Sequence, residues 1–135
     1  PDPRALVEEM ARVLKPGGMF IGSDWLRGGS GDVSPIAARW LEVVHLDFRL
    51  RNLKETQAAL EAAGFLDVRM NDRNAWYQNV VRDELATLEG DRLDGLAQRI
   101  GREQAEYRLR SSQLKQQVIN EGFLRPTHFV GFKPR

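Results

Sequence analysis

The stretch "RVLKPGGMFIGSDW", residues 12–25, says more about the fold than any other part of the sequence. Apolar residues recur at helical spacing before it, and Pro16 with the two following glycines ends the helix that this spacing predicts over residues 3–14. "MFIGSDW" then predicts a short strand whose first residues are apolar on both faces, as in a strand buried between helical layers. We expect Asp24 and Trp25 at the carboxyl end of this strand.

Helices and strands alternate through the rest of the sequence. Asn52 with Glu55 three residues later has the spacing of a capping box, and Gly64 stands where a left-handed helix end favours glycine. The other predicted elements are a helix opened by Ser34-Pro35, a strand over 66–70, a helical region over 74–121 broken near Gly90 and Gly101, and a last strand over 127–132. Such alternation is typical of an α/β domain with a largely parallel sheet.

Composition limits the classes of function. The 135 residues, 41% of them hydrophobic, suffice for one domain with a modest core. Lysine and arginine number 20 against 19 acidic residues, a net charge of +1, so we expect no nucleic-acid partner. The sequence has no cysteine, which excludes disulfides and thiolate metal sites and favours a cytoplasmic location. We expect no membrane span and no secretion signal, and the missing initiator methionine suggests a fragment or a processed product.

Three segments carry a resemblance to a known family. The segment "LVEEMARVLKPGGMFIGSD", residues 6–24, resembles the helix, turn and fifth strand of class I S-adenosylmethionine-dependent methyltransferases. The segment "ALEAAGFLDVRM", residues 59–70, is similar to the following helix and sixth strand, and "PTHFVGFKP", residues 126–134, looks like the antiparallel last strand. The resemblance implies the C-terminal half of a Rossmann-like sheet in one partial domain over residues 1–135, with helical insertions at about 26–50 and 74–122.

The second insertion resembles a particular branch of that family. Residues 74–101, "NAWYQNVVRDELATLEGDRLDGLAQRIG", are similar to the insert of small-molecule N-methyltransferases of the phosphoethanolamine and glycine/sarcosine type. Phe48 stands about where a phosphate-gripping tyrosine of the phosphoethanolamine enzymes would be expected. The resemblance therefore implies a small-molecule acceptor without singling out phosphoethanolamine.

S-adenosylmethionine is the cofactor that the resemblance implies. Members of the family hold it on a glycine-rich first strand-to-helix turn, where only glycine lets the backbone approach the ligand closely, and this sequence does not contain that turn. The one candidate, "RGGSGD" at residues 27–32, lacks the GxGxxG spacing and is better explained as the hinge of a flexible lid. We expect that the cofactor-binding residues lie outside this chain, which would then be inactive alone.

Two residues are candidates for catalysis. Asp24 follows a strand at the edge where open α/β sheets bind ligands, although it could simply cap the loop. His45 lies among apolar residues of a predicted helix and could act as a general base near neutral pH, although a structural histidine is the simpler interpretation. His128, on the last strand, is expected to be a sheet residue. No metal-ligand spacing is present.

Further residues are candidates for substrate binding. The faces of Trp25 and of Trp76 or Tyr77 could hold a methylated ammonium by cation–π attraction, although aromatic residues at helical spacing usually belong to a core. Arg49, Arg51 and Lys115 could pair with a carboxylate or phosphate on a substrate, although solvated helix faces explain most such charges.

The sequence as a whole predicts methyl transfer from S-adenosylmethionine to a small molecule, with an amine as the expected acceptor. In this hypothesis the chain supplies the acceptor-side half and the lid. The alternative is a non-catalytic half-domain that dimerises or regulates and binds no cofactor. Both hypotheses leave the strand at residues 19–24 with an unpaired edge, so we expect a homodimer or a partner in a missing N-terminal half.

Overall fold

The computed structural model describes residues 3–45 and 50–135. The chain divides into two compact units. The sheet unit comprises Pro1–Gly29, Leu50–Arg73 and Arg125–Arg135, and the helical unit comprises Ser30–Arg49 and Asn74–Leu124. The single partial domain expected over residues 1–135 stays a prediction.

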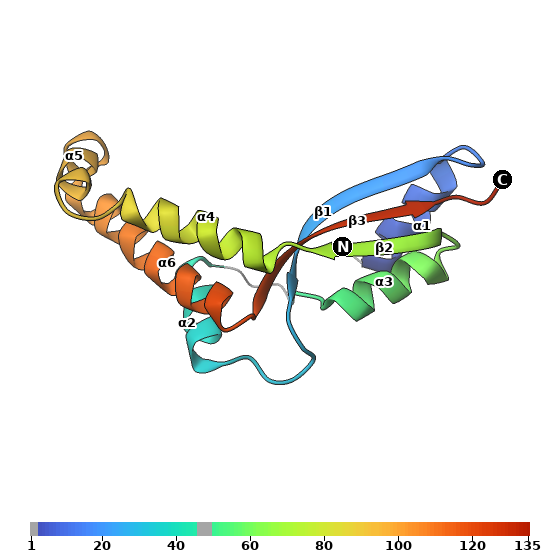
Figure 1. Ribbon diagram of the computed structural model, residues 1–135, viewed down its shortest axis with the longest axis horizontal. Coiled ribbons are helices and arrows are strands. Elements are labelled where there is room, and N and C mark those ends of the chain that lie inside the picture. Colours follow the sequence, from blue (N-terminus) through green and yellow to red (C-terminus); the bar gives the residue numbers. More distant parts are fainter. Residues whose placement is uncertain (1–2, 46–49) are drawn as a thin grey trace. The chain divides into compact units, whose positions relative to one another are not determined.

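The sheet unit contains three strands and two helices (Figure 1). In chain order these are α1 (Pro3–Val13), β1 (Met19–Arg27), α3 (Leu53–Ala62), β2 (Leu66–Asp72) and β3 (Leu124–Phe132). The strand order is β1-β3-β2, and β3 pairs with β2 in antiparallel register, with Met70 opposite Phe129. The backbone N–H of Lys133 donates to the Gly18 carbonyl over 2.8 Å, so the end of β3 also lies beside the start of β1.

These pairings confirm the predicted fold class and correct one detail of it. Because β3 runs antiparallel to both of its neighbours, β1 and β2 share a direction but do not pair along their length. The ladders of the described sheet are therefore antiparallel, in place of the largely parallel sheet that the alternation of elements predicted. The antiparallel last strand implied by the family resemblance accounts for the difference.

One face of this sheet is covered by α1 and α3. Val7 from α1, Leu60 from α3 and Phe65 form the buried cluster between the helices and the strands. Phe20 lies against Phe65 with ring centroids 5.6 Å apart, and Phe129 packs against the same cluster. Burial of this apolar surface is the main term that holds the sheet unit together.

Strand β1 is longer than predicted. It continues to Arg27, whose backbone N–H donates to the Arg51 carbonyl over 2.9 Å and which forms a parallel bridge with Asn52. Asp24 and Trp25 therefore lie inside the strand and not at its end. The extension depends on a pairing with a segment 24 residues away, for which no local sequence signal exists.

Helix α3 begins and ends as its sequence predicts. The Asn52 side chain accepts from the Glu55 N–H over 2.8 Å, and the Glu55 carboxylate accepts from the Asn52 N–H over 3.1 Å. This reciprocal pair satisfies two N–H groups that a helix start leaves without helical partners. Gly64 follows the helix at a φ of 92°, which confirms the predicted left-handed end.

The helical unit is built around one long helix. Helix α6 (Arg102–Asn120) packs against α2 (Pro35–Val43), α4 (Asn74–Ala86) and α5 (Asp91–Ile100) (Figure 1). The breaks near Gly90 and Gly101 are confirmed, and both glycines have positive φ angles, 61° and 90°. Buried side chains of the unit include Ala37, Trp40, Val81, Leu85, Ala105, Val118, Ile119, Phe123 and Leu124.

A buried amide fixes the end of α6. Asn74, at the start of α4, donates from its side chain to the carbonyl oxygens of Ile119 and Leu124, over 3.0 and 2.9 Å. The Ile119 carbonyl also accepts from the Gly122 N–H over 3.0 Å, so the Asn74 amide adds a second donor at the end of α6 and connects it to α4. The two bonds from Asn74 join segments about 45 residues apart and so could not be predicted from local sequence.

The sheet unit exposes apolar side chains on α1 and β1. Leu6, Val13, Met19 and Ile21 are each between 51% and 66% exposed. Strand β1 also lies at an edge of the described sheet, because β3 is its one neighbour in the strand order. Among the described residues, no helix combines the length and the apolar character needed to cross a membrane.

Candidate functional site

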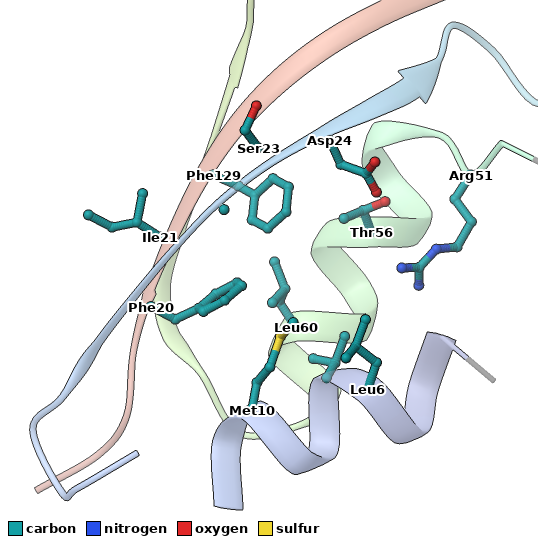
Figure 2. A pocket seen from close by; sticks show the side chains of 12 residues that line it. Leu6, Met10, Phe20, Ile21, Ser23, Asp24, Arg51, Thr56, Leu60 and Phe129 are labelled. Carbon is teal, nitrogen blue, oxygen red and sulfur yellow. The ribbon is translucent and has the colours of Figure 1, made fainter. Parts of the chain in front are cut away.

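The sheet unit contains a cavity of about 330 Å³ between α1, β1 and α3 (Figure 2). Its volume lies at the lower end of the range for small-molecule sites. The lining residues are Leu6, Val7, Met10, Phe20, Ile21, Gly22, Ser23, Asp24, Arg51, Thr56, Leu60 and Phe129. Most of the lining is apolar, and the few polar side chains come from the last part of β1 and the start of α3.

The polar part of the cavity carries one charge of each sign. Asp24 comes from β1, and Arg51 directly precedes the capping box of α3. The Oδ1 atom of Asp24 accepts from the Trp25 N–H over 2.8 Å, which holds the carboxylate while leaving it further acceptor capacity. Within the described part of the chain, neither Asp24 nor Arg51 has an ion-pair partner. The two predicted residues are therefore brought to one cavity and remain available to a ligand.

Close packing of Gly22 and Phe129 shapes the apolar wall. A Cβ atom at Gly22 would lie 2.3 Å from Cε2 of Phe129, well inside contact distance. The Phe129 ring is also held by Phe20, with centroids 5.9 Å apart. Gly22 is thus required by the close approach of a ring from the neighbouring strand.

Trp25 does not line this cavity. It follows Asp24 on the same strand, and successive side chains of a strand point to opposite faces. Its side chain is 42% exposed. The structure therefore separates Trp25 from Asp24, although the two are adjacent in sequence.

The other predicted aromatic residues meet in the helical unit. The rings of Trp76 and Tyr77 on α4 have centroids 5.9 Å apart, and Nζ of Lys115 on α6 lies 5.8 Å from the Tyr77 centroid. The same Nζ pairs with the Glu84 carboxylate at 2.7 Å. Because Trp76 is 51% exposed, its large ring is not a core residue. Three predicted binding residues thus form one surface cluster.

The candidates His45 and His128 are not among the residues that line the cavity. His45 is exposed, lies two residues beyond the end of α2, and has a positive φ of 54°. Its backbone N–H donates to the Glu42 carbonyl over 3.2 Å. His128 is an exposed residue of β3, opposite Asn71. Arg49 lies outside the described residues.

The glycine-rich loop at residues 27–32 makes no close contact with the described chain at two of its glycines. A Cβ atom at Gly29 or Gly31 would meet no atom within 4 Å, so packing within the described chain does not require glycine there. That the cofactor turn lies outside this chain stays a prediction, which rests on the missing GxGxxG spacing. In the part of the chain that the structure describes, no cluster of three potential metal ligands is present either.

Sequence reasoning missed two polar residues of the cavity. Ser23 precedes Asp24 on β1 and lines the cavity, although its side chain points to the opposite face of the strand from Asp24 (Figure 2). Thr56 lies on the buried face of α3 with its hydroxyl donating to the Asn52 carbonyl over 3.0 Å. Thr56 is only 4% exposed, and a threonine at a core position of a helix was the available signal.

Comparison with known proteins gives structural neighbours only. No family model matches the sequence. No curated protein matches it at a significant level.

The solved structures that resemble the chain include several methyltransferases. Haemonchus contortus phosphoethanolamine N-methyltransferase 2, solved with phosphomonomethylethanolamine and S-adenosylhomocysteine, matches 99% of this chain and 30% of its own at 21% identity and a TM-score of 0.85. A putative sarcosine dimethylglycine methyltransferase from Galdieria sulphuraria matches 99% of this chain and 48% of its own at 22% identity and a TM-score of 0.80.

A third structural neighbour is not named as a methyltransferase, yet it has the same fold over the matched residues. The cyclopropane synthase MmaA2 from Mycobacterium tuberculosis matches 96% of this chain and 49% of its own at 11% identity and a TM-score of 0.81. The chain thus spans 30% to 49% of the length of these three proteins. It has the fold of one part of S-adenosylmethionine-dependent methyltransferases, with the helical insertions included.

Proposed function

We propose that this chain takes part in S-adenosylmethionine-dependent methyl transfer to a small-molecule amine and supplies the acceptor-binding part. The observation that carries the proposal is the likeness over 99% of the chain to a methyltransferase solved with a methylated amine and S-adenosylhomocysteine. The cavity in the sheet unit adds chemical support, because Asp24 and Arg51 present opposite charges to it.

The two charged residues have complementary roles in this proposal. The Asp24 carboxylate attracts the protonated amine and can accept the proton that the nitrogen must lose before its lone pair can attack a methyl group. Arg51 pairs with a carboxylate or phosphate elsewhere on the acceptor. The apolar wall around Phe20 and Phe129 excludes water from the methylated part of the acceptor.

The helical unit serves as the lid in this proposal. Trp76 and Tyr77 present aromatic faces, and Lys115 already lies over one of them, so a cationic group can be accommodated beside these rings. Lids of this type align donor and acceptor and keep water out while the reaction proceeds.

A labelled-methyl assay on the natural protein tests the proposal. We expect transfer of tritium from methyl-labelled S-adenosylmethionine to a small amine in a panel that includes phosphoethanolamine, sarcosine and dimethylglycine. Asp24→Asn should lower kcat/KM by about 100-fold, the usual range for losing an acid–base group. Arg69→Gln, an exposed change on β2, serves as the control and should leave the rate within twofold. Absence of transfer to every amine of the panel would contradict the proposal.

The exposed apolar side chains favour one alternative, a dimerising or regulatory half-domain without cofactor. Leu6, Val13, Met19 and Ile21 are each more than half exposed, and apolar side chains that gather at a surface often mark an interaction site. Under this alternative the natural protein would dimerise and would form no S-adenosylhomocysteine in the labelled-methyl assay. Under the methyltransferase proposal the same assay gives product whatever the oligomeric state.

A further inference from the structure

A second hollow, in the helical unit, is independent of the candidate acceptor site. It is a groove of about 310 Å³ between α4 and α6. Glu84, Thr87 and Leu88 form one wall, and Tyr107, Arg108, Ser111 and Ser112 form the other. Arg108, Ser111 and Ser112 follow the i, i+3, i+4 spacing that places side chains on one helix face. The groove therefore lies between one face of α6 and the end of α4 with the turn that follows it.

The walls of the groove are held in fixed positions. The Tyr107 hydroxyl donates to the Val43 carbonyl of α2 over 3.0 Å, which holds that ring against its neighbour. The ion pair of 2.7 Å between Lys115 and Glu84 connects α6 to α4 one helical turn beyond Ser111. The Thr87 hydroxyl bonds to the Glu84 carbonyl in the turn after α4.

The charges that remain free in the groove favour an anion. Lys115 already compensates Glu84, which is the carboxylate of the lining. Within residues 3–45 and 50–135, no side-chain partner is present for Arg108, Ser111 or Ser112. One guanidinium and two hydroxyl groups, all hydrogen-bond donors, thus face the same hollow.

The geometry of the donors distinguishes between oxyanions. A carboxylate bound by both donors of an arginine keeps one further acceptor site on each of its two oxygens, both in the plane of the group, and carries a single negative charge. A phosphate monoester offers three terminal oxygens, so it can bind Arg108 and still accept hydrogen bonds from Ser111 and Ser112. We propose that the groove between α4 and α6 is a binding site for a phosphate monoester, with Arg108 and the two serines as its donors. The inference does not depend on methyl transfer.

Titration of the full 135-residue chain with inorganic phosphate and with methyl phosphate, followed by amide NMR at constant ionic strength, tests this site. We expect saturable shift changes at residues 84–88 and 107–112 with both probes. Arg108→Gln should raise the Kd by about tenfold, the effect of one charge-assisted hydrogen bond. The double change Ser111→Ala with Ser112→Ala should also raise it, because two donors to the third oxygen are lost.

Arg110→Gln is the matched control. It removes the same charge from an exposed position two residues away, which lies on another face of α6, and should leave the Kd within twofold. Shift changes that remain linear in phosphate would overturn the proposal, as would equal weakening by Arg108→Gln and Arg110→Gln. If acetate bound with the same Kd as phosphate, the choice of a phosphate ester as the ligand would be overturned. The same holds if inorganic phosphate bound to the chain and methyl phosphate did not.

Discussion

At the scale of single residues, Gly22 shows how the packing of two neighbouring strands depends on a glycine. The Phe129 ring of β3 can take its position because Gly22 of β1 has no side chain. The hydrogen in place of Cβ lets the Phe129 ring lie over β1 and complete the apolar wall of the cavity. Phe129 also packs against the buried cluster of Val7, Leu60 and Phe65, so stability and cavity shape are coupled at this position.

Gly22→Ala should destabilise the chain by about 1–3 kcal/mol, because the added methyl group overlaps the Phe129 ring and forces one of them to move. Urea denaturation followed by circular dichroism measures the change. Gly31→Ala is the control, since its Cβ would meet no atom within 4 Å, and it should be close to neutral. Equal stability of both variants and the parent would show that the ring does not pack as described.

The residue scale also shows the limit of sequence-based prediction at the site. Asp24 and Arg51 were predicted individually, because charged residues stand out beside a strand and a capping box. Their meeting at one cavity follows from the path of the chain between β1 and α3, which local patterns do not encode. Trp25 was grouped with Asp24 because the two are adjacent, and the alternation of a strand separates them.

At the scale of elements, local signals predicted most helices well. Capping residues, glycines and apolar spacing act within one or two turns, so α3 and the breaks between α4, α5 and α6 lie where the sequence places them. Strand extents were less predictable, because β1 is two residues longer at its end, and β3 three residues longer at its start, than predicted. Strand pairing is a long-range contact, and the position of β3 between β1 and β2 follows from it.

The capping box of α3 gives an element-scale prediction. Asn52→Ala should lower the free energy of unfolding by about 1 kcal/mol, because the Glu55 N–H loses its acceptor. Asn52→Ser keeps a side-chain oxygen at the cap and should retain most of the stability. Thermal melting of the three proteins compares them, and an alanine variant as stable as the parent would contradict the assigned cap.

At the scale of the whole molecule, the exposed apolar side chains of α1 and β1 would gain stability by being buried against another protein surface. The structural neighbours are two to three times as long as this chain, since it spans 30% to 49% of their lengths. A further part of the natural protein or a second copy of this chain could cover these side chains. For the isolated 135-residue chain we predict a second copy.

Sedimentation equilibrium tests the predicted dimer. The isolated chain should dimerise at tens of micromolar, and Ile21→Glu should shift it toward monomer, because a charge at the edge of β1 opposes burial of that edge. Val33→Glu, an exposed apolar position of the helical unit, should leave the association unchanged. A well-folded parent chain that stays monomeric across this concentration range would exclude the prediction.

The central claim is that this chain binds the methyl acceptor while the cofactor is held by residues outside it. Calorimetric titration of the isolated 135-residue chain with S-adenosylmethionine tests that claim most directly. Since residues 27–32 lack the GxGxxG spacing of the family's cofactor turn, we predict no binding tighter than about 1 mM, which corresponds to roughly 4 kcal/mol. Micromolar binding by the isolated chain would contradict the account, because it would place the cofactor site within these residues.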